Sequence, residues 1–145
     1  MIYVLENDYI HRPGWSEVVL ELFNHRIDYN HYVSLYDHLD KYIFSNPDAI
    51  DHWGMYKNLT SKIILGGYNH WRYVPLICSS WVFPQRLLLR DYDLLSIGIS
   101  DNSGCEQFSK KHGTKFLTPI PSYATHSESW FLAPYFDWKC ILEKS

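Results

Sequence analysis

A thiol and two imidazoles are the side chains in this sequence best suited to nucleophilic chemistry. Cys105 falls at the start of an expected short helix, where the helix dipole lowers the pKa of a thiol. His112 or His126 would then supply the general base that activates it. No local signature joins these residues, and a cysteine at a turn equally suits half-buried packing. We therefore predict no catalytic residue.

Two further patterns offer sites for ions. Asp91 and Asp93 alternate at the entry to an expected strand and would hold a divalent cation with a third carboxylate, but such a pair more often faces solvent or pairs with Arg86 and Arg90. The turn at residues 101–104 would present backbone N–H groups to an anion. It lacks the repeated glycines and the lysine of a phosphate loop, so a plain helix cap is the better interpretation.

The histidines and cysteines do not have the spacing of metal ligands. His31 and His38 share the outer face of an expected helix, with His25 one loop away. Seven residues correspond to two helical turns, about 10 Å of rise, which one metal ion does not bridge. The three cysteines are odd in number and widely spaced, so they predict neither a CxxC metal pair nor a disulfide framework. We expect no metal ion and no cofactor.

Negative charge is concentrated in the first third of the sequence. Residues 1–51 hold nine acidic and three basic side chains, a balance of −6, whereas residues 52–145 hold seven acidic and ten basic ones, a balance of +3. A negative face repels nucleic acid and attracts basic proteins. The first candidate partner-binding surface therefore consists of acids on the expected outer helix faces: Glu17, Glu21, Asp37, Asp40, Asp48 and Asp51.

A second candidate surface is aromatic as well as acidic. Aromatic residues make up 17% of the chain, with twelve tyrosines and six tryptophans, which is more than a core of this size needs. Segment 128–138 combines both chemistries in Trp130, Tyr135, Asp137 and Trp138. The alternative for this segment is a core strand whose large side chains face inward.

Length and composition favour a single domain over residues 1–145, with 46% apolar residues to form its core. The first nine residues lack the basic start and apolar stretch of a signal peptide. No apolar run approaches the roughly 20 residues of a membrane span. We expect a cytoplasmic protein that does not enter a membrane.

The first half of the sequence has apolar residues at helical spacing and predicts three amphipathic helices. The first begins at Trp15 and closes over residues 24–28, and the second follows an N-cap at Asn30 and continues to Ile43. Its expected apolar stripe is Tyr32, Leu35, Tyr36, Leu39 and Ile43. The third starts in the capping sequence 45–48 and runs through Ile63 to a stop at Gly66–Gly67.

The second half favours strands, and residues 2–5 suggest either a short first strand or an ordered arm. Expected strands lie at 71–78 with a break at Pro75, and at 81–83, 94–99, 115–117, 130–132 and 135–141. A short helix at 105–112 between two of them suggests one βαβ unit, and Pro119 suggests a sheet edge. The expected fold is α+β, with three amphipathic helices from the N-terminal half packed on a mixed β-sheet from the C-terminal half and one short helix between strands.

These features favour a protein-binding inhibitor, an immunity protein or antitoxin of bacterial type that occupies the basic active surface of a toxin nuclease. Negative charge would accelerate the encounter, and aromatic anchors would supply affinity. Three alternatives stay open. They are a small hydrolase or transferase using the cysteine, histidine or aspartate groups above, a nucleic-acid-binding module that stacks bases on Trp71, Tyr73 or Trp81, and a homo-oligomeric scaffold.

Overall fold

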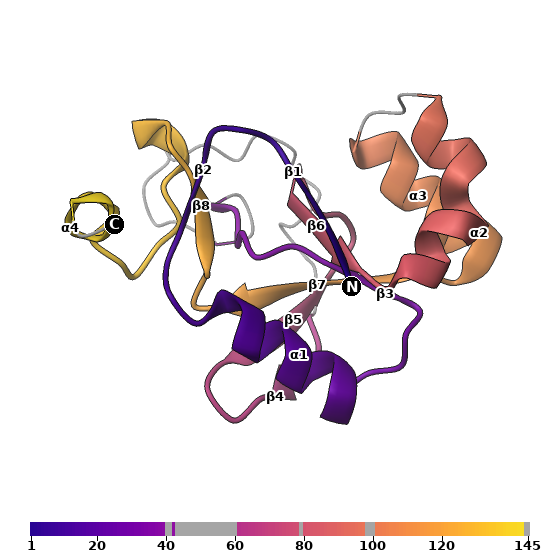
Figure 1. The fold of residues 1–145 in the computed structure, drawn as a ribbon, viewed down its shortest axis with the longest axis horizontal. Coiled ribbons are helices and arrows are strands. Elements are labelled where there is room, and N and C mark those ends of the chain that lie inside the picture. The colour runs from indigo at the N-terminus through magenta and orange to yellow at the C-terminus, as the bar shows by residue number, and fades with distance from the viewer. Residues whose placement is uncertain (40–41, 43–60, 79, 98–100, 144–145) are drawn as a thin grey trace.

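The centre of the molecule is a six-stranded mixed sheet with the strand order β1-β6-β3-β7-β5-β4 (Figure 1). The computed structural model describes residues 1–39, 42, 61–78, 80–97 and 101–143. The strands are β1 (Ile2–Leu5), β3 (His31–Val33), β4 (Ile63–Leu65), β5 (His70–Val74), β6 (Ser80–Phe83) and β7 (Lys115–Ile120). β3 runs parallel to β7, and the other neighbouring strands are antiparallel.

Helices cover both faces of this sheet. α1 (Trp15–His25) packs on one face, whereas α2 (Gln85–Ser96) and α3 (Asp101–His112) pack on the other (Figure 1). The strand side chains alternate between the two layers, as the pleat requires. Val82 contacts the α1 layer while its neighbours Trp81 and Phe83 contact the α2–α3 layer. The sheet is therefore buried on both sides at its centre.

A smaller unit lies beside the sheet. β2 (Tyr9–His11) pairs antiparallel with β8 (Ala124–His126), and the chain continues through the 3-10 helix η2 (Ser129–Phe131) to α4 (Trp138–Leu142). Tyr36, Ala133 and Trp138 form a third apolar cluster, against which Tyr9 packs. Figure 1 shows this unit at the side of the molecule away from α2 and α3.

The expected arrangement of helices and strands is wrong, although the α+β class is right. The sheet begins at the N-terminus, and α2, α3 and α4 all lie in the C-terminal half. Of the three helices expected in the first half, α1 is confirmed, and its buried residues are Val18, Val19, Leu22 and Phe23. The residues expected in the third helix fall mostly outside the described residues, and Ile63 near its expected end lies in β4.

The expected second helix is instead strand β3 followed by extended chain. Tyr32 contacts the α2–α3 layer and Val33 contacts the α1 layer, so successive residues face opposite sides. A central strand buried on both faces is apolar throughout, and its pattern is easily confused with a helical stripe. The apolar residues from Tyr32 to Leu35 therefore look in sequence like one face of a helix, although they are buried on two faces of a sheet.

The second half followed the expected pattern in part. β5, β6, α3 and β7 appear close to their predicted places, and Pro75 ends β5. Residues 94–96 end α2 and form no strand, so the expected βαβ unit is absent. Pro119 lies on β7 inside the sheet order. β3 pairs only with residues 115–117, and Pro119 lies beyond that pairing, where the ladder to β3 needs no N–H donor.

The C-terminal region also differs from the prediction. Residues 130–132 were expected in a strand but lie in and after η2, and residues 135–141 form a turn followed by α4. Within the described part of the chain, no helix combines the length and the apolar character that crossing a membrane requires.

Candidate functional site

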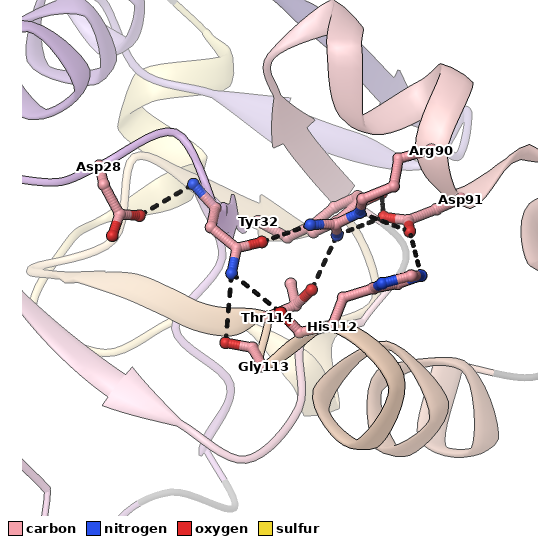
Figure 2. A network of polar contacts seen from close by, with 8 residues as sticks. Asp28, Tyr32, Arg90, Asp91, His112, Gly113 and Thr114 are labelled. Carbon is pink, nitrogen blue, oxygen red and sulfur yellow. Dashed lines mark hydrogen bonds and ion pairs between the residues drawn. The ribbon is translucent and has the colours of Figure 1, made fainter.

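The first polar cluster lies between β3, α2 and α3, and its centre is the buried carboxylate of Asp91. Oδ2 of Asp91 accepts hydrogen bonds from the Tyr32 hydroxyl at 2.8 Å and from Nη2 of Arg90 at 2.6 Å, and Oδ1 accepts from Nε of Arg90 at 2.8 Å (Figure 2). His112 Nε2 lies 3.3 Å from Oδ1 as an ion-pair contact. Burial, reinforced by Asp91, raises the pKa of Tyr32, so its hydroxyl keeps the proton that it donates.

Asn30 and Thr114 complete this cluster and explain why Arg90 is fixed. Nη1 of Arg90 donates to Oδ1 of Asn30 at 2.5 Å, and Nη2 donates to Oγ1 of Thr114 at 2.8 Å. Nδ2 of Asn30 donates to the His112 carbonyl at 3.1 Å. Asn30 therefore joins β3 to the end of α3 and does not cap a helix. Asp91 pairs with Arg90, as one of the sequence interpretations held, and both of its carboxylate oxygens accept hydrogen bonds from the protein.

A second buried carboxylate, Asp37, corrects the prediction of the acidic surface. It was expected on an exposed helix face, yet it is 0% exposed. Oδ1 accepts from Arg72 Nη2 at 2.6 Å and from Thr118 Oγ1 at 3.0 Å, and Tyr42 donates to Oδ2. Asp37 thus links the segment after β3 to Arg72 of β5 and Thr118 of β7, and it is not part of an exposed acidic surface. Asp37 lies in the non-helical segment after β3. The prediction placed it on the outer face of a helix that does not form.

The remaining acids of the first candidate surface are not gathered in one place by the described structure. Glu17 is exposed on α1, while Glu21 is half-buried and accepts from Nε of Arg26 at 3.2 Å. Asp40, Asp48 and Asp51 lie outside the described residues. Of the six predicted acids, Glu17 is the one described as freely exposed.

Cys105, the 101–104 segment and the two tryptophans considered for base stacking have ordinary structural surroundings. Cys105 is fully buried among apolar side chains, and its Sγ donates to the Ile77 carbonyl at 3.7 Å. Residues 101–104 are the first turn of α3 and not a preceding loop. Trp71 is 0% exposed and Trp81 is 9% exposed, so neither ring offers a face to a base.

The second candidate surface lies around the β2–β8 ribbon. Trp130 projects from η2 with 74% of its surface exposed, although tryptophan is usually well buried. The Ser127 N–H donates to the Asp8 carbonyl at 2.8 Å, which places the β1–β2 connection next to the start of η2. We define the Trp130 surface by its members: Glu6, Asp8, His126, Glu128 and Trp130. It contains three acids and no lysine or arginine.

Buried hydroxyl groups hold η2 in place beneath Trp130. The Tyr36 hydroxyl donates to the Phe131 carbonyl at 2.6 Å, and Thr125 Oγ1 donates to the same carbonyl at 3.4 Å. Thr125 Oγ1 also accepts from the Ala133 N–H at 2.6 Å. These hydrogen bonds fix the backbone that carries Trp130.

The other members of the predicted aromatic segment have separate roles. Trp138 is 2% exposed and donates from Nε1 to the Ala133 carbonyl at 2.8 Å, so it is a core residue and not a contact residue. Asp137 is exposed and caps α4 by accepting from the Cys140 N–H at 3.1 Å. Tyr135 is 70% exposed and has φ 78°, an uncommon backbone conformation for a side chain of this size. It borders an open groove of about 500 Å³ with Tyr68 and Pro121.

Glu6, Asp8 and His126 were not identified together from the sequence. They become neighbours because Tyr9 pairs with His126 in the β2–β8 register, across more than a hundred residues. The short apolar stretch after Asp8, at residues 9–11, is the local sequence pattern that indicates strand β2. Nothing in the sequence indicated its partner strand.

Comparisons of the chain with known protein families, with curated proteins and with solved structures found no match.

Proposed function

We propose that this protein is a protein-binding inhibitor, of the immunity-protein or antitoxin type, that uses the Trp130 surface to occupy the basic active surface of a toxin nuclease. The observation that carries the proposal is the 74% exposure of Trp130, two residues after the exposed Glu128. Tryptophan is among the residues most enriched at the energetic centre of protein interfaces. An exposed tryptophan on a fixed backbone supplies such a centre before the partner arrives.

The charge of the Trp130 surface suits a basic partner. Glu6 and Asp8 lie in the β1–β2 connection, which the Ser127 N–H contacts at the start of η2, and Glu128 comes two residues before Trp130. Acids facing a nucleic-acid-binding cleft accelerate association. This surface replaces the one predicted from Asp37 and its neighbours in the first third of the sequence. The negative balance of residues 1–51 is partly internal, because Asp37 is neutralised by Arg72 inside the protein.

The experiment is an affinity pull-down from the native host's lysate at low and moderate salt, read by mass spectrometry, with wild type and Trp130→Ala compared. We expect wild type to retain one basic nuclease-like protein, less of it as salt rises, and to inhibit its nuclease activity once purified. Trp130→Ala should weaken the purified complex by at least about thirtyfold, since interface hot spots contribute about 2 kcal/mol or more. Its thermal unfolding should match wild type.

Tyr92→Ala is the matched control, because Tyr92 is also an exposed aromatic residue, at 61%, but lies on α2. Equal binding by wild type and Trp130→Ala would exclude the Trp130 surface. Recovery of no nuclease-like partner at either salt concentration would contradict the inhibitory function itself.

Self-association through β4 is a second candidate, supported by a separate observation. β4 is the last strand in the sheet order, and its Ile63 and Leu65 are 47% and 64% exposed. An edge strand with exposed apolar residues is a template for pairing with another chain. Sedimentation equilibrium of wild type and Leu65→Lys distinguishes the cases, since a β4-mediated dimer dissociates in the variant and a monomer is unaffected.

A further inference from the structure

Three metal-ligating side chains converge at one end of the β2–β8 ribbon. Glu6 and Asp8 come from the connection between β1 and β2, and His126 is the last residue of β8. One ligand atom from each lies within 4.8 Å of the others. The Tyr9–His126 pairing and the bond from the Ser127 N–H to the Asp8 carbonyl fix the two backbone segments that carry them.

The side chains of Asp8 and His126 each have one buried atom without a hydrogen-bond partner. Oδ1 of Asp8 and Nδ1 of His126 are shielded from solvent, and neither makes a hydrogen bond with any described residue. Buried polar atoms are nearly always satisfied, and each exception calls for an explanation such as an ion. Both atoms belong to side chains of the same small cluster, so one ion bound by Nδ1 of His126 and by both carboxylate oxygens of Asp8 would satisfy both.

The spacing within the cluster suits a shared ion better than a direct hydrogen bond. His126 Nδ1 lies 3.2 Å from Oδ2 of Asp8, but the contact does not have hydrogen-bond geometry. Two atoms that each lie about 2.1 Å from one tetrahedral ion are about 3.4 Å apart. The Asp8–His126 distance is therefore close to that of two ligands on one metal, and a side-chain rotation of Glu6 would supply a third.

We propose that Glu6, Asp8 and His126 bind one divalent transition-metal ion, with Zn²⁺ as its representative. One imidazole nitrogen with two carboxylate oxygens is a ligand set that zinc accepts, whereas Mg²⁺ and Ca²⁺ prefer oxygen ligands alone. The His126 ring is oriented by Tyr9 and Phe131, whose ring centroids lie 5.1 and 5.7 Å away. Three protein ligands leave coordination positions for water or for a group from a partner.

Isothermal titration calorimetry of the full chain with ZnCl₂, in a buffer that does not chelate metals, tests the site. We expect one saturable site in wild type, and at least about a tenfold loss of affinity in Asp8→Asn and in His126→Gln, since even residues that only orient metal ligands affect affinity by this much. Substitution with Co²⁺ gives a second readout, because its visible absorption reports bound nitrogen and oxygen ligands and should be lost in both variants.

Two matched controls keep the result specific. Glu128→Gln removes a neighbouring acid outside the cluster, and His25→Gln removes an exposed histidine on α1, so both should bind Zn²⁺ like wild type. Circular dichroism of each variant establishes that it is folded. Unchanged Zn²⁺ affinity in Asp8→Asn and His126→Gln, or no saturable binding by wild type, would overturn the proposal.

Glu6, Asp8 and His126 also belong to the Trp130 surface, but Zn²⁺ binding by these residues does not require the proposed partner. Trp130→Ala should bind Zn²⁺ normally while losing the protein partner. His126→Gln removes a metal ligand but leaves every acid of the Trp130 surface in place, so measuring how this variant binds the purified partner shows whether the partner needs the ion.

Discussion

The two ends of the molecule each hold an aspartate near a histidine, but only one of these aspartates is satisfied. Asp91, between α2 and α3, accepts three hydrogen bonds from Tyr32 and Arg90. Asp8, on the β2–β8 side, leaves Oδ1 buried without a partner among the described residues. Both carboxylate oxygens of Asp91 are thus used in hydrogen bonds within the protein, whereas one oxygen of Asp8 is left for a ligand.

The largest test of this comparison replaces each aspartate by alanine. Asp91→Ala should lower the free energy of unfolding by about 3–4 kcal/mol, because it leaves the half-buried Arg90 guanidinium without its carboxylate. Asp8→Ala should change it by less than about 1 kcal/mol, as is usual for an ion pair near the surface. Urea unfolding of metal-free protein measures both. Equal losses would show that the two clusters do not differ in kind.

A smaller effect separates the donors within the Asp91 network. Tyr32→Phe removes one hydrogen bond to a buried charge and should lower the free energy of unfolding by about 1.5–3 kcal/mol. The ring stays in its cluster with Phe83 and Phe108, so packing is preserved. The same urea titration applies. An unchanged free energy of unfolding in Tyr32→Phe would mean that the hydrogen bonds from Arg90 are sufficient to stabilise the Asp91 carboxylate.

The smallest expected effect is the dependence of stability on pH, which comes from buried and half-buried histidines. Burial lowers the pKa of His31 and of His11, one near each end of the molecule. The folded protein therefore binds these protons more weakly than the unfolded chain, and stability falls as pH drops below about 6.5. Thermal unfolding from pH 7.5 to 5 should show this decline.

His11→Gln serves as the test variant for the pH effect and should show a shallower decline over the same range. The Asp28 carboxylate does not confound the measurement, because the Asn30 N–H lowers its pKa and it titrates at more acidic pH. A decline as steep in His11→Gln as in wild type would assign the pH dependence to other groups.

Parts of the fold with local signals could be predicted from sequence. α1 was predicted because a surface helix alternates clearly between its buried face, such as Leu22, and its exposed face, such as Glu17. Gly113, with φ 61°, ended α3 where expected. β3 was missed because it is buried on both faces. Such a strand lacks the alternation of apolar and polar residues by which a strand is recognised in sequence.

The candidate site was predicted in part. Trp130 was identified as a contact residue because a large amphipathic ring beside acids suggests an interface, and the structure exposes it. Trp138 has the same residue type in the same segment yet is buried, and only its fit against Tyr36 decides that. Glu6, Asp8 and His126 could not be grouped, because strand pairing over long separations leaves no mark on either local sequence.

The pairing of the N-terminal strands also determines when the fold can form. β1 pairs with residues 80–83, β3 pairs in parallel with residues 115–117, and β2 pairs with residues 124–126. Contacts between residues so distant in sequence slow folding, because a long loop must close before the contact forms. During synthesis, the first three strands emerge from the ribosome well before their partners. The centre of the sheet is therefore completed only after residues 115–117 have been synthesised.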